Sequence, residues 1–188
     1  QAVTTLFPEA KPTIGPPVDD GFYYDFFMEP INEQDLKNIE KLMKKIIKKR
    51  LNVVREEYDN KTIRKMFSKN KFKMEILDEK VGEEAGTSVY RQGDFVDLCR
   101  GPHVSNTSFL RWFKLTNTSQ AYWRADAKRE SLVRIYGMCY STKEELKERQ
   151  RQIEEASKRD HKKIGKEMEL YTINEMIGKG LPIWLPNG

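Results

Sequence analysis

The chain has 188 residues, enough for one well-packed core and short for two, and its 34% of charged residues with no long apolar run exclude a membrane-spanning protein. Two cysteines are too few for a disulfide framework and the first residues do not form a signal peptide, so we expect a cytosolic protein. The net charge of +5 favours an anionic partner without proving one.

The N-terminal part predicts a loop, a strand and a helix. Four prolines and two glycines in residues 8–21 exclude a long helix there. The aromatic run 22–27 is typical of a strand. Asn32 offers a helix N-cap, and apolar residues recur at helical spacing after it, which predicts an amphipathic helix over 33–50.

The middle of the chain predicts an antiparallel sheet. A hairpin is expected around Gln92-Gly93, where two β-rich runs meet. A helical turn is expected around 62–69. Further strands are predicted at 52–58, 72–77, 111–117, 121–126 and 132–140. The predicted fold class is therefore α+β, with one antiparallel sheet packed on the 33–50 helix.

The composition changes near Ser141. From 142 to about 170 the chain is dense in Lys, Arg and Glu with a narrow apolar stripe, which predicts a long helix that crosses a surface or bridges two domains. The Gly- and Pro-rich tail, residues 171–188, predicts the start of another domain.

The segment VDLCRGPHV, residues 96–104, carries the main candidates for chemistry. Asp97 and Cys99 are two residues apart and project from the same face of a strand. A turn at Gly101-Pro102 can bring His103 beside them. Four interpretations stay open: two zinc ligands, completed by His161, Cys139 or carboxylates; a cysteine nucleophile activated by histidine; a hydrolytic pocket in which His103 positions water; or a small core cysteine with a histidine that caps a turn.

Other residues carry weaker signals. Tyr23 and Tyr24 alternate along a strand, so one of them should face away from the core. Lys73, on the strand expected at 72–77, is interpreted as a solvated lysine. Trp123 and Arg124 either stack on a nucleobase or form a core Trp and a surface Arg.

Five motifs in order along the chain carry a resemblance to a known family. They are GPPVDDGFYYDF, VDLCRGPHV, AYWRAD, RIYGMCY and RDHKKIGKEMELY. Together they resemble the editing domain and linker helix of bacterial and eukaryotic threonyl-tRNA synthetases. The resemblance covers essentially the whole chain. It implies an editing domain over 1–141, with the fold of the threonyl/alanyl-tRNA synthetase second additional domain, a linker helix over 142–170, and the start of the class II aminoacylation domain over 171–188.

The resemblance implies that the domain hydrolyses seryl-tRNA(Thr), while the parent enzyme attaches threonine to tRNA(Thr) using ATP. A second site is needed because one missing methyl group gives only about 10- to 200-fold discrimination. The implied partner is the tRNA(Thr) acceptor end with misattached serine, and the parent is expected to be a homodimer through its aminoacylation domain. No cofactor or metal is expected in this chain, since ATP and zinc belong to that other domain.

The resemblance also implies roles for individual residues. Cys99 and His103 match the family's C-x-x-x-H, and Asp97 matches the acidic residue before it. His103 would orient or activate water, and Cys99 would contact water and form the wall that excludes threonine's methyl group. Asp97 would hold the substrate's α-amino group or a neighbouring side chain. Lys73 would steady the oxyanion or the leaving 3′-hydroxyl, and Tyr24 would donate a hydrogen bond near the same atoms.

One part of the family's site has no counterpart in this sequence. An H-x-x-x-H pair on a helix precedes the residue that matches Gln1, so the resemblance implies a partial site and reduced activity. Two alternatives remain: a non-catalytic tRNA-binding or interdomain module, and a zinc-dependent alanyl-type trans-editing hydrolase. The presence of all five site residues argues against the first, and a linker helix argues against the second.

Overall fold

The computed structural model describes residues 1–18, 21–79, 87–159, 161–173 and 182–187. The chain forms two compact units, Gln1–Thr142 and Lys143–Gly188. Within the described residues, no helix is long and apolar enough to cross a membrane.

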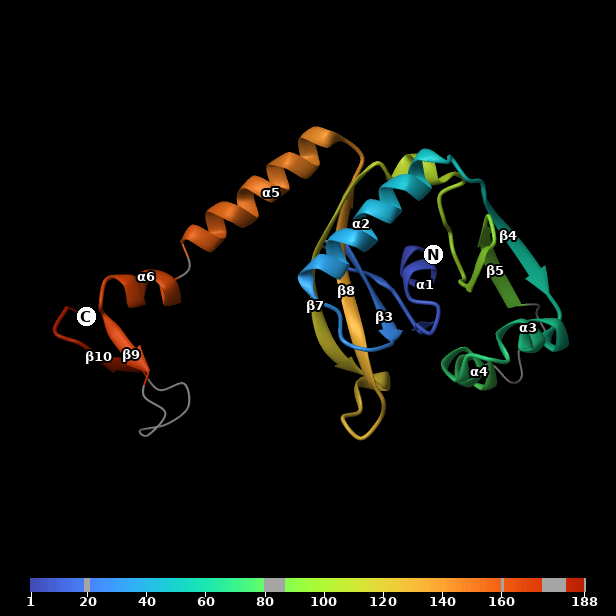
Figure 1. Ribbon diagram of the computed structural model, residues 1–188, viewed down its shortest axis with the longest axis horizontal. Coiled ribbons are helices and arrows are strands. Elements are labelled where there is room, and N and C mark those ends of the chain that lie inside the picture. Colours follow the sequence, from blue (N-terminus) through green and yellow to red (C-terminus); the bar gives the residue numbers. More distant parts are fainter. Residues whose placement is uncertain (19–20, 80–86, 160, 174–181, 188) are drawn as a thin grey trace. The chain divides into compact units, whose positions relative to one another are not determined.

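The first unit contains a five-stranded antiparallel sheet with the strand order β1-β3-β8-β7, in which β2 also pairs with β3. Figure 1 shows its three long strands, β3, β8 and β7, side by side. Relative to β8, strand β7 carries one extra residue between Leu115 and Thr118, which is a β-bulge. The strands predicted at 22–27, 111–117 and 132–140 are confirmed. The bounds are β1 (Lys11–Pro12), β2 (Pro17–Val18), β3 (Gly21–Phe27), β7 (Trp112–Tyr122) and β8 (Ser131–Tyr140).

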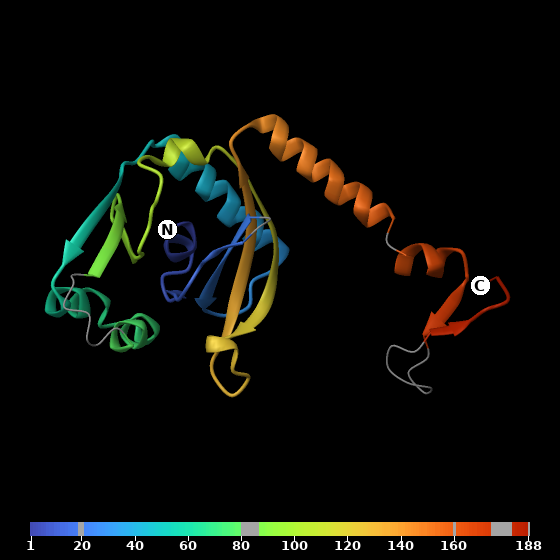
Figure 2. The ribbon, with the colours of Figure 1, turned by 180° about the vertical axis from the view of Figure 1, so that it is seen from behind.

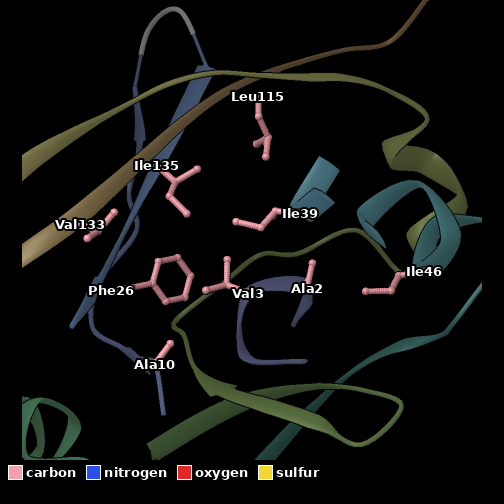
Figure 3. Packing of buried hydrophobic residues seen from close by; sticks show 9 residues of the cluster. All are labelled: Ala2, Val3, Ala10, Phe26, Ile39, Ile46, Leu115, Val133 and Ile135. Carbon is pink, nitrogen blue, oxygen red and sulfur yellow. The ribbon is translucent and has the colours of Figure 1, made fainter. Parts of the chain in front are cut away.

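Two helices, α1 (Ala2–Leu6) and α2 (Glu33–Lys48), pack on this sheet. The predicted cap of α2 is confirmed: the Asn32 side chain accepts a hydrogen bond from the Asp35 amide, and Asp35 accepts one from the Asn32 amide. Figure 3 shows the apolar side chains of both helices turned toward those of the sheet. This core consists of Ala2, Val3, Ala10, Phe26, Ile39, Ile46, Leu115, Val133 and Ile135.

A second antiparallel sheet, with the order β4-β5-β6, lies in the same unit, so the prediction of a single sheet is wrong. Alternating patterns identify strands but do not show which strands pair, and β4–β6 pair only with one another within the described sheets. The predicted hairpin and helical turn are confirmed. The bounds are β4 (Val53–Tyr58), α3 (Asn60–Phe67), α4 (Lys71–Asp78), β5 (Thr87–Gln92) and β6 (Phe95–Leu98).

The segment FKMEIL, predicted as a strand, forms helix α4 instead. The Asn70 side chain caps this helix by accepting hydrogen bonds from the amides of Phe72 and Lys73 at 3.1 and 3.3 Å. The helix packs in two directions: Phe72 lies in a cluster with Trp123, and Leu77 lies in the core of the smaller sheet. Six residues with alternating apolar positions suit either element, and here tertiary packing decides.

The segment AYWRAD, also predicted as a strand, is the end of β7 followed by a short 3-10 turn, η2 (Trp123–Ala125). Arg124 and Ala125 both have φ of 57°, which ends the strand. Trp123 is 1% exposed and its Nε1 donates to Glu75 at 3.0 Å. Of the two interpretations of this pair, a core Trp beneath a surface Arg is therefore the one that fits. A second 3-10 turn, η1 (Thr107–Leu110), precedes β7.

The second unit contains helices α5 (Lys143–Lys158) and α6 (His161–Glu167) and a two-stranded antiparallel sheet of β9 (Tyr171–Ile173) and β10 (Pro182–Trp184). Helix α5 has no buried side chain over its described length, as its charged sequence predicts. A single charged helix over 142–170 is not confirmed, because α5 ends at Lys158.

Replacing Ile39 tests the larger core, since this side chain is 1% exposed at the centre of the cluster in Figure 3. We expect Ile39→Ala to lower the free energy of unfolding by about 2–5 kcal/mol, through lost burial and the cavity left behind. Urea unfolding followed by circular dichroism measures this loss. Val54→Ala, at a side chain that is 50% exposed, is the control. Equal losses for the two variants would contradict the described core.

Candidate active site

A cavity of about 1150 Å³ lies in the first unit and is lined by residues of both sheets. Helix α1 bridges the sheets (Figure 2): Ala2 and Val3 belong to the larger core, and Gln92 of β5 donates to the Gln1 side chain at 2.8 Å. All five residues singled out by the family resemblance line this cavity. They are Tyr24 on β3, Lys73 on α4, Asp97 on β6, and Cys99 and His103 in the segment after β6.

Lys73 and Asp97 form a buried ion pair in the cavity wall, so the interpretation of Lys73 as a solvated lysine is wrong. The Lys73 Nζ lies 2.6 Å from Asp97 Oδ1, and the two side chains are 3% and 13% exposed. The amide of Leu98 also donates to Oδ1 at 2.8 Å. A solvated lysine was expected because a strand was expected; the helix turns this side chain inward instead.

Tyr24 completes the group around the Asp97 carboxylate. Its hydroxyl donates a short hydrogen bond to Oδ2 and accepts one from Lys73 Nζ at 3.2 Å. Burial, and then the neighbouring Asp97 carboxylate, raise the pKa of Tyr24 well above its usual value. The phenol therefore stays protonated and remains a donor. Gly15 is required beside this ring, since a Cβ there would lie 2.2 Å from Tyr24 Cδ2.

Cys99 and His103 are brought together by the turn that follows β6. The Nε2 atom of His103 lies 2.9 Å from Cys99 Sγ, and the Gly101 amide donates to the same sulfur at 3.3 Å. Gly101 has φ of 80°, a conformation that favours glycine, and its peptide bond to Pro102 is cis. The sequence-based prediction that the Gly-Pro turn returns His103 to Cys99 is confirmed.

The surroundings of His103 favour the neutral form of its imidazole. Partial burial lowers the pKa of His103 below 6.5, and the Asp97 carboxylate opposes that shift. With Nε2 beside the thiol, the other ring nitrogen, Nδ1, has no hydrogen-bond partner among the described residues. This nitrogen is therefore available to a water molecule or a ligand.

Tyr90 and Ser88 support this pair, and the sequence analysis missed both. The Tyr90 ring stacks on His103, with centroids 4.0 Å apart and planes 19° apart, and the Ser88 hydroxyl donates to the Cys99 carbonyl at 2.7 Å. The register of the β5–β6 hairpin, which the sequence predicts, indicates both residues. Because Gln92 pairs with Phe95, the register places Tyr90 opposite Asp97, and Ser88 opposite Cys99.

The remaining candidates lie outside this group. Tyr23, on the other face of β3 from Tyr24, packs under Arg134, whose guanidinium is 3.9 Å from the ring centroid. Cys139 lines the cavity from β8, and burial raises its thiol pKa. The side chain of His161 lies outside the described part of the chain. No group of three His, Cys, Asp or Glu side chains suited to a metal ion occurs in the described part. Within that part, Cys99 and His103 are therefore two potential zinc ligands without a third.

Sequence similarity relates this chain to one family of proteins. Residues 87–136, which include Asp97, Cys99 and His103, match the family described as the threonyl and alanyl tRNA synthetase second additional domain. The threonine–tRNA ligases of Nautilia profundicola and Campylobacter lari are each 48% identical to the chain, over 189 and 193 residues. That of a Campylobacter jejuni strain is 49% identical over 189 residues. Each match covers 100% of this chain.

The chain belongs to the threonyl-tRNA synthetase family. It spans 31% of the length of these threonyl-tRNA synthetase relatives. The mixed helical and antiparallel fold of its first unit agrees with the α+β class expected for the second additional domain of such a synthetase.

Replacing Asp97 tests the buried ion pair. We expect Asp97→Asn to destabilise the first unit by about 3–5 kcal/mol, because it leaves the Lys73 ammonium uncompensated in the interior. Urea unfolding measures the change, with Asp94→Asn, an exposed position on the same hairpin, as the matched control. If both variants lose the same stability, Lys73 does not depend on Asp97.

The lowered pKa of His103 can be measured directly by NMR. His161→Gln leaves His103 as the sole histidine of the chain, and we expect its titration midpoint below 6.5. Between that midpoint and 6.5 the unfolded state binds more protons than the folded state, so stability falls as pH is lowered through this window. His103→Gln should remove that component of the pH dependence. A midpoint at or above 6.5 would contradict the burial of the ring.

Proposed function

We propose that the chain carries an editing site that hydrolyses the ester bond of seryl-tRNA(Thr). The observation that supports this most directly is the gathering of Tyr24, Lys73, Asp97, Cys99 and His103 in one cavity of a threonyl-tRNA synthetase family member. A buried ammonium and a neutral imidazole suit the hydrolysis of an ester, which needs a positioned water and stabilisation of a developing oxyanion.

In the proposed reaction, water attacks the carbonyl carbon that joins serine to the 3′-oxygen of the terminal adenosine. A carbon–oxygen bond forms, and the carbonyl oxygen becomes an oxyanion. The bond to the 3′-oxygen then breaks, and the proton lost by the water is passed to that oxygen. The products are serine and tRNA(Thr) with a free 3′-hydroxyl, so no cofactor is consumed.

Lys73 would stabilise the oxyanion or the departing 3′-oxygen. Its ammonium is held by Asp97 and Tyr24, so it is positioned before the substrate arrives. Both Asp97 oxygens already accept hydrogen bonds within the protein. Of the two roles expected for Asp97, holding neighbouring side chains is therefore better supported than binding the α-amino group.

His103 would position the attacking water through Nδ1, because Nε2 faces the Cys99 thiol. In the neutral tautomer whose Nε2–H donates to Cys99 Sγ, Nδ1 is unprotonated and can accept a proton from that water as the bond to carbon forms. Cys99 would contact the water and form the wall that threonine's methyl group cannot pass. Rejecting threonine by size at this site complements the poor rejection of serine at a synthetic site.

The remaining proposals concern the parent synthetase. We infer an editing domain over 1–141, a linker helix within 142–170, and the start of the aminoacylation domain over 171–188. The parent would attach threonine to tRNA(Thr) with ATP in the cytoplasm, as a homodimer with zinc in its aminoacylation domain. The relatives carry the name threonine–tRNA ligase, which supports this assignment.

The test is release of serine from seryl-tRNA(Thr) by the chain, with threonyl-tRNA(Thr) as the competing substrate. We expect serine to be released faster than threonine. His103→Ala should slow serine release by roughly 10²- to 10⁴-fold, the range for loss of a general base, and Cys99→Ala should slow it as well. His161→Ala, at the chain's other histidine, is the matched control and should retain the rate.

If the chain releases no serine, the same assay is repeated with a helix that carries an H-x-x-x-H pair joined to its N-terminus. Recovery would place half of the site on that helix. Continued inactivity of a folded protein would favour the non-catalytic tRNA-binding module. A rate that is abolished by chelators and restored by zinc would instead favour the alanyl-type hydrolase.

A further inference from the structure

The charged side chains that line the cavity are paired with opposite charges except at one residue. Among the described lining residues, three side chains are cationic, Lys73, Arg100 and Arg124, and two are anionic, Glu79 and Asp97. Lys73 is paired with Asp97 at 2.6 Å, and Arg124 Nη2 pairs with Glu79 in a short contact. Arg100 has no carboxylate partner among the described residues. The cavity therefore keeps one uncompensated guanidinium.

The backbone on both sides of Arg100 is held firmly, while its side chain is exposed. Before it, the Cys99 carbonyl accepts from the Ser88 hydroxyl at 2.7 Å. After it, the Gly101 amide donates to Cys99 Sγ, and a Cβ at Gly101 would lie 1.9 Å from the Tyr90 hydroxyl oxygen. The turn that positions Cys99 and His103 thus also fixes the backbone of Arg100, whose guanidinium has no carboxylate partner among the described residues, at the cavity lining.

Under the proposed function, on which this inference rests, the substrate brings an anion to this position. The ester is carried by the 3′-oxygen of the terminal ribose, and the 5′-oxygen of that ribose carries a phosphodiester. When the ester carbonyl lies at Cys99 and His103, the nearest phosphate is one ribose away. Arg100 is the next residue after Cys99, and a planar guanidinium can bind a phosphate through two parallel hydrogen bonds.

We propose that Arg100 binds the phosphodiester on the 5′ side of the terminal nucleotide. This contact anchors the acceptor end, so that the ester meets Lys73 and His103 in a fixed position. Because the guanidinium approaches a phosphate and no reacting atom, its contribution belongs to binding and not to the chemical step. Loss of Arg100 should therefore raise KM and leave kcat unchanged.

Three short esters test this in the form of the protein that is active, the chain or the full-length synthetase. They are 3′-O-seryl adenosine, which has no phosphate; the 3′-O-seryl ester of the dinucleotide CpA; and the same dinucleotide with a neutral methylphosphonate linkage. We expect the wild type to show a KM about tenfold lower for the charged dinucleotide than for the other two esters. Arg100→Gln should abolish that difference, Arg100→Lys should restore part of it, and added salt should weaken it.

Arg111→Gln is the matched control, because Arg111 is also exposed but does not line the cavity. It should keep the wild-type preference. If Arg100→Gln changes KM equally for all three esters, or for none, Arg100 does not bind this phosphate and the inference is overturned while the proposed function stands. If the wild type hydrolyses neither the short esters nor seryl-tRNA(Thr), the proposed function itself fails.

Discussion

Lys73 places an ammonium group at a position that is 3% exposed, where an unpaired charge would cost several kcal/mol. Asp97 neutralises it, and Tyr24 donates to the same carboxylate, so α4, β6 and β3 meet at one carboxylate. The cost of desolvation offsets much of the attraction within such a pair, but removing either partner leaves the other charge buried and uncompensated. The pair thus adds little to net stability, and its main effect is to hold α4 in place. Because Lys73 of α4 lines the cavity, this also fixes part of the cavity wall.

The positions of the polar groups on β6 and just after it follow from backbone pairing. The hairpin of β5 and β6 has two residues between the paired Gln92 and Phe95, and this register sets every later cross-strand pair. A slip of one residue would turn Asp97 away from Lys73 and would separate Ser88 from Cys99. The same register sets Tyr90, whose ring supports His103. The strand ladder therefore positions the polar groups of the site as well as the apolar core.

The sequence predicted the elements whose signals are local. The cap at Asn32, the hairpin turn at Gly93 and the reversal at Gly101 each depend on a few adjacent residues, and each is where it was expected. The α4 helix was missed because residues 72–77 suit both periods, and only packing on Trp123 and on the smaller sheet decides between them. The burial of Lys73 and the split into two sheets depend on contacts between distant segments, which one sequence does not reveal.

The tautomer of His103 bears on how the site would act. The Gly101 amide donates to Cys99 Sγ, and the geometry fits the neutral tautomer in which the Nε2–H of His103 donates to the same sulfur, 2.9 Å away. The ring nitrogen that faces Cys99 then carries a proton and cannot take one from the thiol. In this tautomer Nδ1 is unprotonated and is a competent base for water. The site is thus better suited to direct hydrolysis than to a covalent intermediate on Cys99.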